Sequence, residues 1–322
     1  MGTGPFELKI LLTGATGFIG KNLIAHLKGH ELFCLVRSPA KFESIKSDNI
    51  FPVYGDITGE LPDLPEVDFI IHNAGVVRCA SKKYYEVNSE GTAALLLKAK
   101  KLKTLKKFIF ISSQAASGPA ELTHPAEESD ALHPLSDYGK SKALAEKFVR
   151  ESDLPYIILR PSAVYGPGDR DLFVTFRMVK KGLVFLPAGK KCVNFINVKD
   201  VCEGIEKAIL SPLVNDTFFL AHPQIETQEN FAGIIAECAG KKCIIVRVPF
   251  LFLRLAGAFF SVAGFFTGKT ALLNSQKIKE LEAEHWVVNP ERMLNGLGFH
   301  PRYDLKTGVA LTLKWYEERG WL

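Results

Sequence analysis

Tyr138 and Lys142 stand four residues apart in the segment DYGKSK, which covers residues 137–142. On a helix, side chains at this spacing rise from the same face, so the phenol and the ammonium group can meet. An unperturbed tyrosine, with a pKa of about 10, is a poor base at neutral pH. A neighbouring cation stabilises the phenolate, and we therefore expect Lys142 to lower the pKa of Tyr138. The pair predicts proton exchange with an alcohol, unless the two are exposed neighbours by chance.

A second segment with chemical meaning is the glycine-rich stretch TGATGFIGKNL, which begins at Thr13. It runs directly from an apolar stretch into a helical pattern, with glycines at positions 14, 17 and 20. Glycine lets the backbone approach a pyrophosphate closely, and a helix N-terminus offers free N–H groups. Because the segment closes the first strand of a βαβ pattern, it predicts a dinucleotide site rather than a plain turn.

The second predicted strand ends in CLVRSPAK, with Arg37 near the expected position of the adenosine ribose. Sites for NAD usually place an acidic residue there to hold the ribose 2′-hydroxyl, whereas an arginine suits a 2′-phosphate. Arg37 therefore favours NADP(H) as the cofactor. NAD(H) stays open as the alternative, because an arginine at a strand end is often only a solvated charge.

The framework for these residues is visible in the first half of the chain, where short β-branched runs alternate with helical patterns. This alternation is typical of a parallel sheet with helices on both faces. Near-continuous apolar strands indicate that both faces are covered. We predict an α/β protein: a Rossmann-type doubly wound parallel sheet with a smaller, mostly helical C-terminal substrate domain. The predicted strands span residues 8–14, 31–37, 50–56, 68–75, 107–113 and 155–162.

After Arg160 the pattern loosens, because YGPGDRDLF is a loop rich in proline and glycine. Two short runs, VNFINV (193–198) and DTFFLAH (216–222), are expected to return and extend the sheet. The predicted dinucleotide-binding domain is therefore residues 7–165, with 191–222 returning to it. The predicted substrate-binding region is residues 166–190 and 223–322.

Composition argues against several classes of function. A formal charge of +5, with both signs mixed along 322 residues, gives no reason to expect a nucleic-acid partner. The eight histidines and six cysteines show neither metal-ligand spacing nor a disulfide pattern, so we predict no metal site. Unpaired cysteines and the lack of a secretion signal pattern at the N-terminus favour a reducing, cytoplasmic location.

One stretch departs from this pattern: PFLFLRLAGAFFSVAGFFTG, residues 249–268. It is nearly long enough to cross a bilayer, but Arg254 and three glycines argue against a true span. We expect either a buried or lid helix, or a helix at 250–267 that makes peripheral contact with a membrane or lipid, or lines an apolar substrate pocket.

Eight motifs follow one another in a familiar order: TGATGFIG from Thr13, GDI (55–57), HNAG (72–75), VNSEGT (87–92), FISS (110–113), YGKSK (138–142), LRPSAVYGPGD (159–169) and FINVKDV (195–201). In order and spacing they resemble the extended short-chain dehydrogenase/reductases, the superfamily of NAD-dependent epimerases and dehydratases. The resemblance covers almost the whole chain. It implies an enzyme with a nicotinamide cofactor, and a homodimer formed through the helices that carry VNSEGT and YGKSK.

The resemblance also implies roles for individual residues. Ser113, with Ser112 as the alternative, would join Tyr138 and Lys142 as a catalytic residue and donate a hydrogen bond to the substrate oxygen. Lys142 would also anchor the nicotinamide ribose. The implied cofactor-binding residues are Gly14, Gly17, Phe18, Ile19 and Gly20 in the pyrophosphate loop, Arg37, Asp56 and Ile57 around the adenosine, Ala74 and Gly75 at a strand end, Tyr138 and Lys142, and Pro161 and Val164 beside the nicotinamide.

The motifs do not all point to the same class of small-molecule substrate. Nucleotide-sugar members of the superfamily usually clamp the diphosphate with an arginine in R-x-F-x-x-V and with another before the last D-x-x-K helix. This chain has Val193 at the first position and no arginine before Asn289, although Arg247 or Arg292 could substitute.

Three functions are therefore weighed. Similarity to 3β-hydroxysteroid dehydrogenases and dihydroflavonol reductases favours redox chemistry on a secondary alcohol or ketone of a hydrophobic or lipid-like substrate. A nucleotide-sugar epimerase or dehydratase is the alternative, and a non-catalytic NADP(H)-binding regulator is the third.

Overall fold

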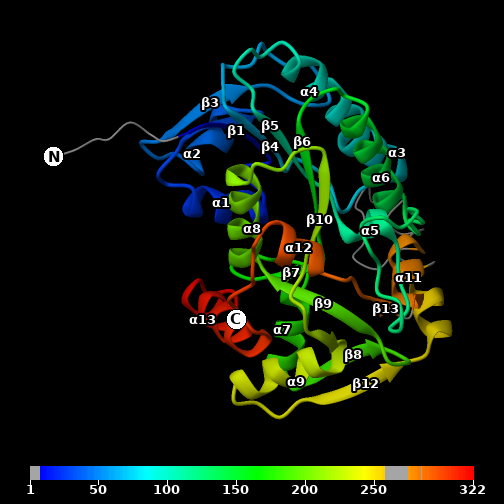
Figure 1. The fold of residues 1–322 in the computed structure, drawn as a ribbon. Coiled ribbons are helices and arrows are strands. Elements are labelled where there is room, and N and C mark those ends of the chain that lie inside the picture. Colours follow the sequence, from blue (N-terminus) through cyan, green and yellow to red (C-terminus); the bar gives the residue numbers. More distant parts are fainter. Residues whose placement is uncertain (1–7, 258–274, 284) are drawn as a thin grey trace.

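The computed structural model describes residues 8–257, 275–283 and 285–322. Its larger part is a seven-stranded sheet in the order β10-β6-β5-β4-β1-β2-β3 (Figure 1). Every pairing in this sheet is parallel, and all six strands predicted for the first half of the chain are present. The strands are β1 (Lys9–Thr13), β2 (Glu31–Val36), β3 (Ile50–Tyr54), β4 (Phe69–His72), β5 (Lys107–Ile111), β6 (Tyr156–Pro161) and β10 (Asp216–Leu220).

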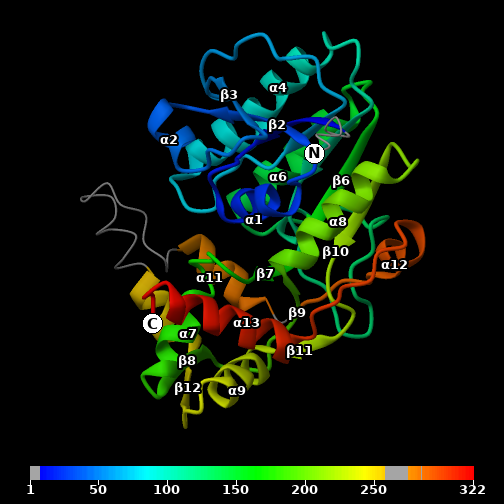
Figure 2. The same ribbon diagram turned by 90° about the vertical axis from the view of Figure 1, so that its left-hand side faces the viewer.

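Helices cover both faces of the sheet, as the apolar strands predicted. Helices α1 (Phe18–His26) and α8 (Val198–Leu210) share one core with Ile10 and Leu12 of β1. The intervening Leu11 points the other way, into a core with α4 (Gly91–Ala99) and α6 (Asp137–Arg150). Figure 2 shows α1 and α8 on the near side of the sheet. The Rossmann-type α/β fold is confirmed.

The helical segment before α4 contains a wider turn. Helix α3 (Ser81–Tyr84) continues as a π-helix, η1 (Tyr85–Glu90), and then as α4. Asn88 of η1 accepts a hydrogen bond from the Val76 N–H at 2.8 Å and donates to the Ser141 hydroxyl at 3.0 Å. The π-turn therefore ties the loop after β4 to α6.

The smaller part of the molecule contains two small sheets beside its helices. Strands β7 (Ala163–Tyr165), β9 (Cys192–Asn197), β11 (Ile225–Thr227) and β13 (His285–Trp286) form one, and β8 (Leu183–Pro187) and β12 (Ile244–Val248) form the other. Its core includes several aromatic side chains, among them Phe176, Phe231 and Tyr316. Other helices in the described ranges include α2 (Pro39–Glu43), α5 (Gln114–Ser117), α7 (Phe173–Lys180), α9 (Gln228–Cys238), α11 (Ser275–Glu282), α12 (Glu291–Gly296) and α13 (Leu305–Glu318).

Only one of the two returning strands extends the large sheet. Residues 216–220 do so as β10, which pairs with β6. The prediction for 193–198 was wrong, because β9 pairs with β7, β11 and β13 in the smaller sheet. All six residues of β9 are buried, so its apolar pattern fits a central strand of either sheet. Strand β7 follows β6 in the chain but lies outside the large sheet, where it pairs in parallel with β9. This pairing places β9 in the smaller sheet.

The apolar stretch at 250–267 is only partly described. Residues 250–257 are helical, whereas 258–267 lie outside the described residues, as does residue 7 at the expected domain start. Within the described ranges, no helix combines the length and the apolar character needed to cross a bilayer.

Candidate active site

Tyr138 and Lys142 both lie on α6, in the first turns after its N-cap. The Ser136 hydroxyl caps this helix by accepting a hydrogen bond from the Gly139 N–H at 3.1 Å. Gly139 has a packing role: a Cβ at this position would lie 2.2 Å from the carbonyl oxygen of Ala115 on α5. The glycine between the tyrosine and the lysine therefore lets α6 approach α5 and the residues just after β5.

The ammonium group of Lys142 is buried and held by the main chain. Its Nζ donates to the carbonyl oxygen of Ile111, the last residue of β5, at 2.6 Å. It also lies 4.6 Å from the centre of the Phe110 ring. Burial lowers the pKa of Lys142 to about 8, although the Glu146 carboxylate raises it. Lys142 is therefore largely protonated at neutral pH and loses its charge in mildly alkaline solution.

Tyr138 and Ser113 meet at the same point. Ser113 follows β5 and caps α5, where its Oγ accepts from the Ala115 N–H at 3.1 Å. Burial raises the pKa of Tyr138 to about 12, and hydrogen bonding with Ser113 lowers it by less. The expectation that Lys142 lowers the pKa of Tyr138 was wrong for this structure, since the ammonium group is directed to Ile111. At neutral pH the phenol is protonated and can donate a proton.

Ser112, the alternative to Ser113, has a different partner. Its hydroxyl donates to Glu146 Oε1 at 2.6 Å, and its side chain is buried. Successive residues after a strand point in different directions, so Ser112 faces the interior while Ser113 faces Tyr138.

Sequence reasoning missed the buried carboxylate behind this site. Glu146, one turn beyond Lys142 on α6, is completely buried and accepts hydrogen bonds from Ser112, Arg150 and Arg160. Burial alone would raise the pKa of Glu146, but the hydrogen bonds and charge of Arg160 hold it below its usual value. The signal was available, since Tyr138, Lys142 and Glu146 follow one another at intervals of four on one helix face.

The glycine loop forms the predicted cradle against the end of β4. Gly14 has a φ of +70°, and a Cβ there would lie 2.7 Å from the Ala74 nitrogen. The Gly17 N–H donates to the Gly14 carbonyl at 3.0 Å, and a Cβ on Gly20 would lie 2.2 Å from that oxygen. A side chain at Gly14 would clash with the end of β4, and one at Gly20 would clash with the loop itself. Glycine at these positions therefore keeps the loop compact and close to the strand end, which fits a dinucleotide pyrophosphate site.

The cradle continues to the acid–base pair through Gly75. A Cβ on Gly75 would lie 3.6 Å from Lys142 Nζ, so backbone without a side chain separates the glycine loop from the lysine.

At the end of the site predicted to hold the adenosine, the exposed Arg37 lies close enough to Asp56 to lower the pKa of that carboxyl. Ile57 is buried against Gly91. The structure thus brings these residues, predicted from three strand ends, to one edge of the sheet.

The remaining predicted cofactor residues lie on adjoining elements. Phe18 and Ile19 form the first turn of α1, and a Cβ on Gly168 would lie 3.8 Å from the Phe18 ring. Pro161 ends β6, and Val164 lies in β7 beside Ile196.

A neutral histidine, His72, fixes the strand end of this cradle, a role that sequence reasoning missed. The Ala74 N–H donates to Thr13 Oγ1 at 3.0 Å, and Thr13 lies 2.7 Å from His72 Nδ1. On the other side, His72 Nε2 lies 2.8 Å from Thr92 Oγ1, which donates its proton to the Asn88 carbonyl. Thr92 must therefore accept from Nε2–H, leaving Nδ1 to accept from Thr13. Burial lowers the pKa of His72 to about 3, which agrees with a neutral ring.

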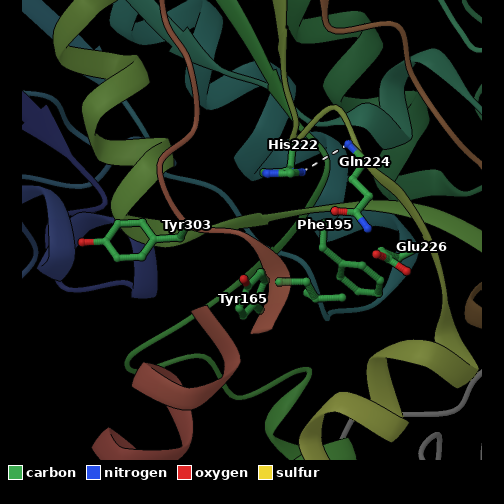
Figure 3. Close-up of a pocket in the computed structure, with 7 residues that line it drawn as sticks. Tyr165, Phe195, His222, Gln224, Glu226 and Tyr303 are labelled. Carbon is green, nitrogen blue, oxygen red and sulfur yellow. Dashed lines mark hydrogen bonds between the residues drawn. The ribbon is translucent and has the colours of Figure 1, made fainter. Parts of the chain in front are cut away.

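A separate small hollow in the C-terminal part carries none of the predicted site residues. Figure 3 shows Tyr165, Phe195, His222, Gln224, Glu226 and Tyr303 around it, and Leu305 completes the lining. It has neither the glycine loop nor an acid–base pair. We therefore place the active site at the α6 residues Tyr138 and Lys142.

Comparison with known proteins identifies the family of the chain. Residues 10–218 match the model of the NAD dependent epimerase/dehydratase family. The chain belongs to this family. The extended short-chain dehydrogenase/reductase membership predicted from the motifs is confirmed, and the protein is an enzyme of that type.

Relatives within the epimerase/dehydratase family differ in their reactions. UDP-glucose 4-epimerase from Vibrio cholerae is 33% identical over 272 residues, which is 78% of this chain and 82% of that protein. Ceramide reductase from Caulobacter vibrioides is 26% identical over 335 residues, covering 97% and 96% of the two chains. Among solved structures, dTDP-glucose 4,6-dehydratase from Bacillus anthracis, in complex with NAD, has a TM-score of 0.77 at 22% identity and covers 97% of each chain. The family thus fixes a nicotinamide-dependent enzyme but leaves the substrate open.

Proposed function

We propose that this enzyme is an NADP(H)-dependent reductase of a hydrophobic or lipid-like ketone, with Tyr138 as proton donor. The main support for an apolar substrate is that both arginines that could replace the missing diphosphate clamp are already bonded to other groups of the protein. Arg247 donates to the Gly189 carbonyl at 2.9 Å and pairs with Glu229. Arg292 pairs with Asp216 at 2.5 Å.

The position of the usual first clamp arginine supports this reading. Val193 is only 6% exposed and lies within the core of the smaller part of the molecule. A diphosphate carries charge that must be matched by cations or by several hydrogen bonds. Without a free arginine at these three positions, an apolar substrate is the better chemical fit.

Two relatives named for apolar substrates align over almost the whole chain, and so does a nucleotide-sugar enzyme, the dTDP-D-glucose 4,6-dehydratase of Homo sapiens, which covers 98% of it at 23% identity. Ceramide reductase covers 97% of it, and the 3-beta-hydroxysteroid dehydrogenase of Mycolicibacterium neoaurum covers 96% at 24% identity. The Vibrio UDP-glucose 4-epimerase covers 78%. Coverage therefore does not separate the two substrate classes, and the proposed substrate class rests on the engaged arginines and on Val193.

The site residues have complementary roles in such a reduction. A nicotinamide cofactor, when bound along the glycine loop, supplies the hydride. Tyr138, protonated at neutral pH, gives its proton to the ketone oxygen, and Ser113 donates a second hydrogen bond to that oxygen as negative charge develops. Lys142, fixed by the Ile111 carbonyl, holds the nicotinamide ribose in this proposal.

The preference for NADP(H) rests on the end of β2. Asp56, the nearby carboxylate, accepts hydrogen bonds from the Thr58 N–H at 3.0 Å and the Thr58 hydroxyl at 2.9 Å. The Asp56 carboxylate therefore bonds within its own turn, and we do not expect it to bind the ribose 2′-hydroxyl of NAD(H). Arg37 is exposed beside it and can bind a 2′-phosphate.

The test is a turnover assay with NADPH or NADH and three substrate types: a long-chain keto lipid, a 3-ketosteroid and UDP-glucose. We expect net NADPH consumption with at least one apolar ketone and no reaction with the sugar nucleotide. Interconversion of UDP-glucose and UDP-galactose without net cofactor consumption would establish the second candidate, an epimerase, which the 33% identity to the Vibrio enzyme favours.

A further inference from the structure

The two-stranded sheet of β8 and β12 has one buried and one bare face. Val184 is completely buried and, with Ile245, joins the core of the smaller part. The residues that alternate with them are Leu183 and Phe185 on β8 and Ile244 and Val246 on β12, and all four are exposed. In the parallel register Leu183 lies opposite Ile244, and Phe185 lies opposite Val246.

The bare side is unusual because a solvent-facing strand surface is normally polar. Ile244 is 69% exposed and Phe185 is 50% exposed. Apolar exposure continues in the helix that follows β12, where Leu251, Phe252 and Leu255 are each more than 60% exposed. Figure 1 places β8 and β12 at the end of the molecule opposite β3, so neither strand is covered by the large sheet.

Positive charge lies at the start of both strands. Lys181 precedes β8, and Lys241 and Lys242 precede β12. The strands begin side by side, since the Ile244 N–H donates to the Gly182 carbonyl at 2.9 Å. All three lysines are exposed, and among the described residues none of them has an ion pair within 4.0 Å. Arg247 adds charge at the other end of β12, although Glu229 neutralises it.

We propose that the exposed face of β8 and β12, together with Lys181, Lys241 and Lys242, docks this enzyme on an anionic lipid bilayer. Apolar side chains that protrude beside lysines match a membrane interface, where the side chains enter the acyl boundary and the ammonium groups meet lipid phosphates. A second copy of the chain is a poorer occupant, because strand-to-strand pairing would bring two basic surfaces together. The proposal concerns location on a membrane and does not depend on which ketone is reduced.

The experiment is co-sedimentation of the full-length protein with vesicles of phosphatidylglycerol and phosphatidylcholine, and with vesicles of phosphatidylcholine alone. We expect binding to the anionic vesicles that weakens with salt, and little binding to the neutral ones. Each lysine near an anionic surface is worth about fivefold in partitioning, so the triple change of Lys181, Lys241 and Lys242 to Gln should lower binding about 100-fold.

Matched variants distinguish vesicle binding through this surface from a general effect of the protein's charge or exposed apolar side chains. The charge control changes Lys28, Lys101 and Lys103 to Gln, three exposed lysines on other elements. The apolar pair is Phe185→Ser against Leu97→Ser, since Leu97 is 67% exposed on α4. Phe185→Ser should lower vesicle binding about tenfold, and Leu97→Ser should leave it unchanged.

Three results would overturn the proposal. The first is absence of binding to anionic vesicles, and the second is an equal loss of binding in the two lysine triples. The third is a dimer in light scattering that Phe185→Ser dissociates while vesicle binding stays unchanged, which would assign the face to a second copy. Cofactor binding by every variant, measured by NADPH fluorescence, checks that the fold is intact and is read independently of substrate turnover.

Discussion

Arg160 holds Glu146 through two hydrogen bonds, 2.9 Å from Nε and 2.8 Å from Nη2, and both side chains are at most 1% exposed. Each of these buried charges is stabilised by the other, so the fold is destabilised when either one is removed. Removing one partner leaves an uncompensated buried charge, which usually costs about 3–5 kcal/mol.

Glu146→Gln should therefore lower the free energy of unfolding by roughly 3 kcal/mol, since it keeps the shape of the side chain but leaves Arg160 unpaired. Urea unfolding followed by circular dichroism measures this change. Arg150→Gln is the control, because Arg150 is the more exposed partner of the same carboxylate, and we expect less than about 1 kcal/mol. Equal effects of the two substitutions would contradict a buried pair that dominates the network.

Activity should fall as pH rises above about 8. Burial lowers the pKa of Lys142 to about 8, so its ammonium group loses a proton in that range and holds the nicotinamide ribose, the role proposed for it, less firmly. The pH profile of kcat/KM for ketone reduction reports this limb. Since Glu146 raises the pKa of Lys142, Glu146→Gln should move the limb to lower pH. A limb that does not move in that variant would show that another group titrates there.

Tyr138→Phe should reduce kcat about 100- to 10,000-fold while leaving the dissociation constant for NADPH nearly unchanged, because only the proton donor is lost. Tyr84→Phe is a suitable control, since the Tyr84 ring lies 6.0 Å from that of Tyr138 but its hydroxyl donates to the Val77 carbonyl. Undiminished turnover in Tyr138→Phe would remove the basis for the proposed chemistry.

Gly14→Ala should weaken NADPH binding at least about tenfold and destabilise the fold by about 1–3 kcal/mol. The position has a φ of +70°, and the new methyl group would lie 2.7 Å from the backbone of residues 73 and 74. Fluorescence titration measures the affinity. Gly29→Ala, where a Cβ would meet no atom within 4 Å, should change neither quantity.

Arg37→Ala should lower kcat/KM with NADPH by about 10- to 100-fold, the usual worth of a charge-assisted contact, and change the value with NADH little. Lys46→Ala, an exposed lysine paired with Glu43, is the comparison for a general loss of charge. If the two cofactors are affected equally, Arg37 does not read the 2′-phosphate.

The sequence by itself determined the large sheet, the glycine loop and the spacing of Tyr138 and Lys142. These features are local: alternation of strands and helices, a glycine pattern at a strand end and a four-residue helical interval are all read within short windows. Parallel topology then brings the carboxyl ends of the strands to one edge. The resemblance of the motifs assigned Ser113 and Gly75 to one site with Lys142, and parallel topology is the physical reason why residues so far apart in the chain meet there.

Only the tertiary structure decided where the charges and partners lie. The buried pair of Glu146 and Arg160 and the chain of hydrogen bonds through His72 depend on contacts between residues that no spacing rule connects. The raised pKa of Tyr138 depends on burial and on the turning of Lys142 toward Ile111, which reversed the expectation drawn from their spacing. The place of β9 in the smaller sheet is of the same kind, because a fully buried strand carries no sequence signal for which buried neighbour it pairs with.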